Sequence, residues 1–303
     1  MKFLAFLSIV LIADVLSAQS SDCPYWLDLL QGEEVSEKAL LDDLAKVQVI
    51  YVGETHTLER HHDTQRALLQ ALSERGRPMA LGMEQIEARY QPVVDRFNAG
   101  ELDFDGLARE MDWAKKWKNF EQYRALCELA QARKIPLVGL NAPAEVIRAV
   151  GKGGLESLSP EQRKELPAEI DTKDPVYEKL LDRLLSVHMT MDPAKLRTVF
   201  EAQVARDETM AENVARLLRE NKVVMVVCGS GHVNYGLGTP DRVRRRAPEA
   251  ADRILAVTES GELRLTPAEE AMRREISLSH EDLRQIGRPL GDYLQVKPRI
   301  PAK

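Results

Sequence analysis

Five short apolar segments that alternate with helical patterns constrain the fold of this chain more than any other feature of its sequence. The segments span residues 47–52, 79–83, 135–140, 223–228 and 254–258. Each is rich in aliphatic and β-branched residues, which is typical of strands buried on both faces of a parallel sheet. The five segments are therefore predicted to be strands of one mostly parallel sheet.

Helical patterns lie between the predicted strands. Apolar residues recur at helical spacing over 57–75, where Thr57 is the expected N-cap, over 123–133 and over 200–221. Strands that alternate with helices predict an α/β fold in which helices flank the sheet. Residues 84–134 and 141–222 are much longer connections than one helix requires. We expect them to be helical excursions between strands two and three and between strands three and four.

The first 20 residues have the three-part pattern of a secretory signal peptide. A basic start precedes an apolar run over 3–13, and small residues follow over 16–20. The apolar run is too short to span a bilayer, and a buried N-terminal helix is the alternative. The pattern predicts a signal peptide over 1–20 and a single mature domain over 21–303. We expect export to the periplasm or cell envelope, with no membrane span.

The three cysteines do not form a disulfide framework by number or spacing. Cys23 follows the predicted cleavage site, but the preceding Ser21-Asp22 matches a lipidation site poorly. A soluble exported protein is therefore favoured over a lipoprotein. Cys228 falls in a predicted strand and is expected in the core, whereas a bridge between Cys23 and Cys127 stays open.

Composition excludes several classes of protein. Hydrophobic residues make up 44% of the 303 residues and charged residues 30%, as in ordinary globular proteins. Disordered, collagenous and multi-span membrane proteins are thereby excluded. The formal net charge is −6 and no basic block stands out, so we expect no nucleic-acid partner.

Polar residues follow four of the predicted strands directly. Ligands of parallel α/β sheets bind outside the carboxyl ends of the strands, so these side chains are expected to converge. The first and fourth strands are each followed by a short Gly-x-x-His element, 53–56 and 229–232. The residues predicted to line one pocket are Glu54, His56, Glu84, Asn141 and His232.

Each of these residues also has a purely structural interpretation. Glu54 and His56 could cap the following helix, and Glu84 could form an ion pair with Arg206. Asn141 could form a turn before Pro143. As a site, Glu54, His56, Glu84 and His232 could bind a divalent metal that activates water, or one histidine could act as a general base held by a carboxylate. The predicted helix over 200–221 adds Gln203, Arg206 and Asp207 as supporting residues.

Other histidines and aromatic residues lie on the first predicted helix and in the two long connections. His61 and His62 lie one turn along the first predicted helix, where one of them could face the site. Histidines at such positions are more often exposed to solvent. His188 lies beside two methionines and could be core, surface or a ligand. Helix-spaced Trp113, Trp117 and Tyr123 are predicted to belong to the core rather than to a cofactor site.

These residues in this order resemble the ChaN family of iron-regulated, haem-binding envelope proteins of bacteria. The resemblance spans about residues 47–243 and includes paired Gly-x-x-His elements that a wider superfamily with Tiki-type peptidases and erythromycin esterases shares. It rests on the following residues and motifs: Gly53-Glu54-Thr55-His56, Met83-Glu84-Gln85, Trp117 to Tyr123, the segment 135–143, His188, the segment 202–211 and Gly229-Ser230-Gly231-His232-Val233.

The resemblance implies a parallel-sheet α/β protein that binds haem, commonly as a homodimer, and takes part in iron or haem uptake, with an outer-membrane haem receptor as a candidate partner. Iron in the family is bound by a tyrosine, a hard ligand suited to ferric iron, and a histidine lies near the propionates. His188 matches that histidine. Residues 142–147 contain no tyrosine, so Tyr123 and Tyr177 are the candidate iron ligands.

Three classes of function follow from these observations. The first is a non-enzymatic haem-binding protein, in which haem lies near His188 and away from the strand ends. The second is a peptidase- or esterase-like hydrolase that uses Glu54, Glu84, His56 and His232. The third is an interaction protein with a vestigial pocket. The first is the leading prediction.

Overall fold

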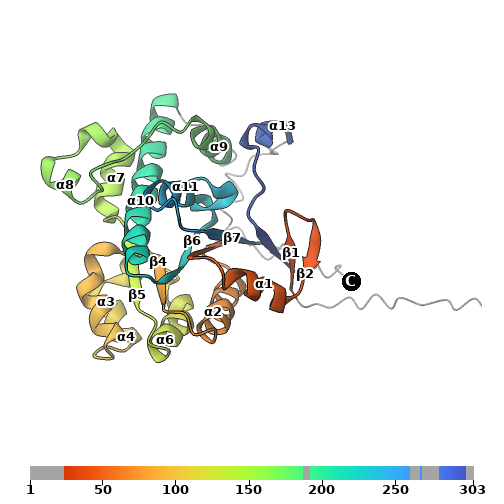
Figure 1. Ribbon diagram of the computed structural model, residues 1–303. Coiled ribbons are helices and arrows are strands. Elements are labelled where there is room, and N and C mark those ends of the chain that lie inside the picture. The colour runs from red at the N-terminus through yellow and green to blue at the C-terminus, as the bar shows by residue number, and fades with distance from the viewer. Residues whose placement is uncertain (1–23, 187–191, 260–266, 268–279, 298–303) are drawn as a thin grey trace, which may run out of the picture.

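A mixed sheet of eight strands lies at the centre of the protein, in the order β2-β1-β8-β7-β3-β6-β4-β5 (Figure 1). The computed structural model describes residues 24–186, 192–259, 267 and 280–297. The strands from β8 to β5 run parallel, whereas β1 pairs antiparallel with β2 and with β8. The strands are β1 (Tyr25–Asp28), β2 (Glu33–Val35), β3 (Val49–Glu54), β4 (Met79–Glu87), β5 (Leu137–Asn141), β6 (Val223–Gly229), β7 (Asp252–Val257) and β8 (Tyr293–Val296).

Helices cover both faces of this sheet. The α-helices are α1 (Glu37–Leu44), α2 (Glu59–Ser73), α3 (Gln91–Asn98), α4 (Phe104–Glu110), α5 (Trp113–Lys116), α6 (Arg124–Ala132), α7 (Ala144–Gly153), α8 (Pro160–Lys164), α9 (Pro175–Ser186), α10 (Pro193–Arg219), α11 (Thr239–Arg246) and α13 (His280–Leu283). Short 3-10 turns are η1 (Ala88–Tyr90), η2 (Phe120–Tyr123), η3 (Leu155–Ser157), η4 (Ser230–His232), η5 (Asn234–Gly236) and η6 (Arg284–Ile286).

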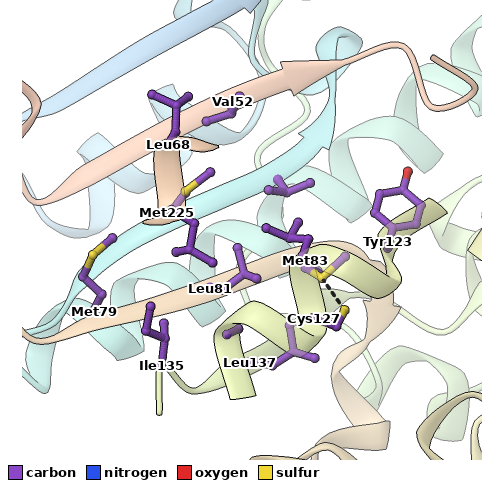
Figure 2. Close-up of a cluster of buried hydrophobic side chains, with 14 of the residues drawn as sticks. Val52, Leu68, Met79, Leu81, Met83, Tyr123, Cys127, Ile135, Leu137 and Met225 are labelled. Carbon is purple, nitrogen blue, oxygen red and sulfur yellow. Dashed lines mark hydrogen bonds between the residues drawn. The ribbon is translucent and has the colours of Figure 1, made fainter. Parts of the chain in front are cut away.

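Strict alternation along the strands divides the core into two layers. Ile50 and Val52 of β3 pack with residues of α1, α2 and α6, and Figure 2 shows part of this layer around Met83 and Cys127. Val49 and Tyr51 point to the opposite face and pack with residues of α10 and α11. Successive side chains of a strand point to opposite faces, so the same alternation decides where the polar residues at the strand ends point.

The predicted fold class is confirmed. Each of the five predicted strands is present, and β4 continues four residues beyond its predicted end, to Glu87. Both long connections are helical excursions: the first holds α3 to α6, and the second holds α7 to α10. One prediction is wrong in detail, because Leu58 rather than Thr57 is the N-cap of α2.

Three strands have no counterpart in the prediction. β1 and β2 are short, and β2 is mostly exposed, so neither has the apolar run of a buried strand. β8 lies beyond the last predicted strand and inserts between β1 and β7. Partner strands, rather than local hydrophobicity, therefore define this edge of the sheet.

The prediction that Cys228 lies in the core is confirmed. Cys228 is buried in β6, and Cys127 is a buried free thiol with its sulfur 3.9 Å from that of Met83 (Figure 2). Cys23, the predicted signal peptide and His188 lie outside the described residues. Within the described parts of the chain, no helix is both long and apolar enough to cross a bilayer.

Candidate functional site

The order of the strands brings the two Gly-x-x-His elements together. β6 lies between β3 and β4, so the carboxyl ends of these three strands are adjacent. Glu54, the last residue of β3, pairs with Gly229, the last residue of β6. Pairing between β4 and β6 ends at Met83, so Glu84 follows the last paired residue of its strand. Glu54, Glu84 and Gly229 therefore meet at one edge of the sheet.

Glu54 anchors a hydrogen-bond cluster on the α2 side of the sheet. Its carboxylate oxygens lie 2.6 Å from Nδ1 of His56 and 2.6 Å from Nε2 of Gln65. Gln85 donates to the same carboxylate over 2.8 Å, and the hydroxyl of Tyr123 donates to it as well. A buried carboxylate needs such donors, and these hold it ionised although burial opposes the charge, so the pKa of Glu54 is lowered.

Glu84 anchors a second cluster on the α10 side. Its Oε2 accepts a hydrogen bond of 2.6 Å from the amide of Gly229, and its Oε1 lies 3.3 Å from Nε2 of His232. The opposite ring nitrogen of His232 lies 2.8 Å from Oδ1 of Asp207. Arg206 approaches Glu84 with a nitrogen–oxygen distance of 3.7 Å. His232 is therefore fixed between two carboxylates.

Further donors complete this second cluster around Asp207. Tyr177 donates to Asp207 over 2.9 Å and Thr239 donates over 2.8 Å. The side-chain nitrogen of Gln203 lies 3.0 Å from Nδ1 of His232. The structure thus places Gln203, Arg206 and Asp207 against the strand-end residues, as their spacing along α10 suggests.

The two site histidines differ in charge and access. Burial opposes the charge on His232, but Glu84 and Asp207 raise its pKa to about 10. Burial also disfavours the charge on His56, while the bond to Glu54 and the charge of Glu84 raise its pKa above the ordinary value. The side chain of His56 is 34% exposed, against 7% for His232. His232 is thus a fixed buried cation at neutral pH, and His56 is the ring that a ligand can reach.

Gly229 leaves the space that His56 occupies. A Cβ atom at this position would lie 2.8 Å from Nε2 of His56 and 3.5 Å from Oε2 of Glu84. Real Cβ atoms essentially never approach another atom this closely. Gly229, in the second Gly-x-x-His element, therefore makes room for His56, in the first element.

His61 and His62 are both buried, not exposed to solvent. His61 accepts from the amide of Thr55 and contacts the carbonyl of Thr258 through its other nitrogen, and burial lowers its pKa to about 4. His62 faces the site, with Nε2 at 3.5 Å from Glu54, and burial lowers its pKa. Only His62 of this pair belongs to the strand-end cluster.

A cleft opens beside the two clusters, which we call the β4–α5 cleft. It encloses about 680 Å³, including the space open to solvent, and lies between the end of β4, η1, α5, the end of β5, α7 and α10. Glu84, Asn141 and Arg206 line it. Trp117 also lines it and contacts His56 edge to face, at 4.9 Å between ring centres.

The predicted divalent metal is not supported. Among the residues that the structure describes, no group of three or more His, Cys, Asp or Glu side chains could hold a metal ion. The physical reason is that both carboxylates already accept hydrogen bonds. Glu54 accepts from Gln65 and Gln85, and Glu84 accepts from the Gly229 amide.

Neither candidate tyrosine is placed as an iron ligand. Tyr123 and Tyr177 are both buried, and their hydroxyls donate to Glu54 and Asp207. Burial and these carboxylates raise the pKa of both phenols above its ordinary value. The two rings belong to the interior, and Trp113 is likewise a core residue, as predicted.

A second, more apolar groove lies between α9 and α10 and encloses about 880 Å³, including open space. We call it the α9–α10 groove. Leu181, Leu185, Leu196 and Phe200 line it, with Lys179 at its edge. In Figure 1, α9 lies at the opposite end of α10 from α3 and α4. The connection between α9 and α10 is the segment that contains His188.

Several residues of the site carry no recognisable signal in the sequence. Gln85 is the exception, because it follows Glu84, and strand alternation places it on the face of Glu54. Gln65 lies on α2 and Tyr177 on α9, and only the packing of these helices brings them to the strand ends.

Comparison with known proteins identifies the relatives of this chain. A family model described as haem-binding uptake, Tiki superfamily, ChaN matches residues 40–243. The solved structure of cofacial haem binding to ChaN of Campylobacter jejuni is 20% identical with a TM-score of 0.67, and the match covers 90% of this chain and 96% of that one. At this identity the likeness establishes the fold alone.

Two further proteins are also similar to the chain. An erythromycin esterase mutant, EreC in its open conformation, is 15% identical with a TM-score of 0.45, over 77% of this chain and 76% of that chain. Protein RETICULATA-RELATED 5, chloroplastic, of Arabidopsis thaliana is 21% identical over 240 residues, which is 72% of this chain. The match spans 32% of the length of that curated relative.

Proposed function

Since the chain belongs to the ChaN family of haem-binding proteins, as the match over residues 40–243 shows, we propose that it binds haem in the α9–α10 groove. Haem needs an apolar slot for the macrocycle and polar groups at its rim for the propionates. The observation that carries this placement is the apolar lining of the groove, supplied by Leu181, Leu185, Leu196 and Phe200.

The rim of the groove suits the propionates. Lys179 is exposed, and Arg197 lines the groove while it pairs with Glu178 and Glu201. His188 follows α9 by two residues in the sequence, and we propose it as a haem contact. The side chains of the strand-end cluster are instead engaged in their own hydrogen bonds.

The wider role that we propose is haem or iron handling in the cell envelope. The signal-like pattern over residues 1–20 supports export to the periplasm. A homodimer and an outer-membrane haem receptor as partner belong to the same proposal. Mass spectrometry of envelope fractions tests the export step, since an intact Met1 or an acylated Cys23 would contradict it.

The haem assignment is tested by titrating the mature protein with hemin and recording absorption spectra. Saturable binding is expected, and His188→Ala should weaken it about tenfold or more, because a hydrogen bond to a charged group contributes about 1.5–3 kcal/mol. His56→Ala and His232→Ala should leave it nearly unchanged. Loss of binding in His232→Ala with no effect of His188→Ala would move haem to the strand ends.

A second candidate function is hydrolysis by acid–base chemistry at His56. The observation that favours it is the bond of 2.6 Å between Glu54 and Nδ1 of His56, beside an open cleft. A carboxylate on Nδ1 fixes the tautomer whose Nε2 is a free base. This is the arrangement in which a histidine takes a proton from water.

The proposed reaction uses water as its only co-reactant. Nε2 of His56 takes a proton from water as its oxygen bonds to the carbonyl carbon of an ester or amide. Arg206, which is 33% exposed, can stabilise the resulting oxyanion. The carbon–oxygen or carbon–nitrogen bond then breaks, and His56 returns the proton to the leaving alcohol or amine.

The raised pKa of His56 gives this candidate a pH signature. The base form gains population as the pH rises through a value above 6.5, so hydrolysis of a chromogenic ester should increase from pH 6 to pH 8. Glu54→Gln should lower the rate and shift the rising limb to lower pH. A rate that does not differ between wild type and His56→Ala would rule the mechanism out.

A further inference from the structure

The β4–α5 cleft has a lining that the haem proposal does not use. Tyr90, Met111 and Trp117 provide apolar and aromatic surface. Trp113 supports this wall from the core, where its indole nitrogen donates to the carbonyl of Gln85 over 2.9 Å. A flat apolar or aromatic group can therefore pack in the cleft.

Hydrogen-bond donors dominate the polar part of the same lining. Lys116, Arg148 and Arg206 all line the cleft. Asn141 also lines it and is only 7% exposed. Its Oδ1 accepts from the amide of Ala142, and within the described residues its side-chain nitrogen has no hydrogen-bond partner. This nitrogen is available to an acceptor in the cleft.

The carboxylates of the lining are already paired. Glu84 is held by His232 and Arg206, and Glu87 lies 2.6 Å from Arg89 and 3.5 Å from Lys116. Arg148 differs from these cations, because it makes no ion pair or hydrogen bond within the described chain. Its exposed guanidinium is thus free to bind an anion.

We propose that the β4–α5 cleft binds an organic carboxylate with an aromatic or flat apolar body, whose carboxylate contacts Arg148 and whose body packs on Trp117. Arg148 and a carboxylate can form paired hydrogen bonds, and Trp117 gives the body a face beside His56. Binding of the ligand does not depend on the second candidate function; only its hydrolysis rests on that function. An ester or amide bond in such a molecule, placed at His56, would be the one hydrolysed.

Calorimetric titration with 1-naphthoate tests the binding without measuring turnover. Saturable binding is expected, and Arg148→Ala should weaken it about tenfold or more. Arg148→Lys should restore part of the loss. Lys152→Ala is the matched control, since Lys152 is exposed on the same helix and does not line the cleft. The neutral 1-naphthamide should bind more weakly and should not distinguish wild type from Arg148→Ala.

Three results would overturn the inference: no saturable binding, equal affinity for naphthoate and naphthamide, or equal losses in Arg148→Ala and Lys152→Ala. Saturating hemin should leave the affinity for naphthoate unchanged. If hemin displaces naphthoate and Arg148→Ala also weakens the binding of hemin, the cleft is the haem site. In that case both the inference and the placement of haem in the α9–α10 groove fail. Absence of esterase activity alone would overturn only the second candidate function.

Discussion

Nδ1 of His56 lies 2.6 Å from the carboxylate of Glu54, two residues earlier in the chain. The pair lies where β3 ends, so the end of one strand holds both the imidazole and the carboxylate that is bonded to it. Glu54 is buried, whereas His56 contacts Trp117, which lines the β4–α5 cleft. The hydrolysis proposed as the second candidate function therefore depends on the position of this one ring.

Gly229→Ala should displace the ring of His56. The new Cβ would lie 2.8 Å from Nε2, and relief of such overpacking costs about 1–3 kcal/mol. As the ring moves from Glu54, its pKa should fall toward the ordinary value of 6.5. Titration of the histidine signals by NMR measures this change. Gly231→Ala is the control, because nothing lies within 4 Å of its added Cβ, and equal effects of the two variants would contradict the steric account.

Stability should fall at alkaline pH because His232 loses its charge. Its pKa is about 10 in the folded protein and 6.5 as the ordinary value. The stabilisation is therefore complete below pH 6.5 and is lost as the pH rises through 10. A difference of one pKa unit corresponds to about 1.4 kcal/mol. Urea unfolding at pH 6, 8 and 10 should show this decline.

His232→Gln provides the comparison for this pH dependence. The variant should be less stable than wild type at pH 6, and the difference should shrink toward pH 10. A difference that is constant with pH would show that the charge of His232 does not stabilise the fold. Glu84 contributes to stability with the opposite pH dependence. Because its pKa is lowered in the folded protein, it stabilises the fold above pH 4.5, and this contribution is lost as the pH falls.

Glu208→Gln should destabilise the protein by about 3 kcal/mol or more, the range for breaking a buried ion pair. Glu208 is fully buried and lies 2.7 Å from Arg245 and 2.5 Å from Arg246. Chemical denaturation measures the loss. Glu212→Gln is the control four residues later on α10, since Glu212 is exposed. Similar stability of both variants would mean that these arginines are not held by Glu208.

This arginine run also shows a limit of sequence interpretation. Arg244, Arg245 and Arg246 are consecutive and form a short basic run in a chain of net charge −6. In the fold, Arg244 pairs with Asp252 over 2.8 Å, and the other two pair with Glu208. Arg245 and Arg246 are therefore neutralised by an acid on another helix, Glu208 of α10, and no local pattern predicts that pairing.

The parallel core of the sheet could be predicted because its strands are continuous apolar runs. The edge strands β1, β2 and β8 could not, since their order depends on pairing between the two ends of the described chain. The meeting of Glu54, Glu84 and His232 followed from the strand-end rule. The link from Asp207 to His232 did not, because it requires the packing of α10 against the sheet.

The central claim, that haem binds in the α9–α10 groove, is tested most directly by hemin titration of Leu185→Glu. Leu185 lines the groove and is partly exposed, so the variant protein should fold normally. The carboxylate that it introduces should repel both the apolar macrocycle and the charged propionates of haem. Leu30→Glu is the matched control, since Leu30 is 88% exposed and lines a different surface. We predict that Leu185→Glu weakens hemin binding at least tenfold, whereas Leu30→Glu binds as wild type does. Equal hemin affinity in all three proteins would contradict the claim.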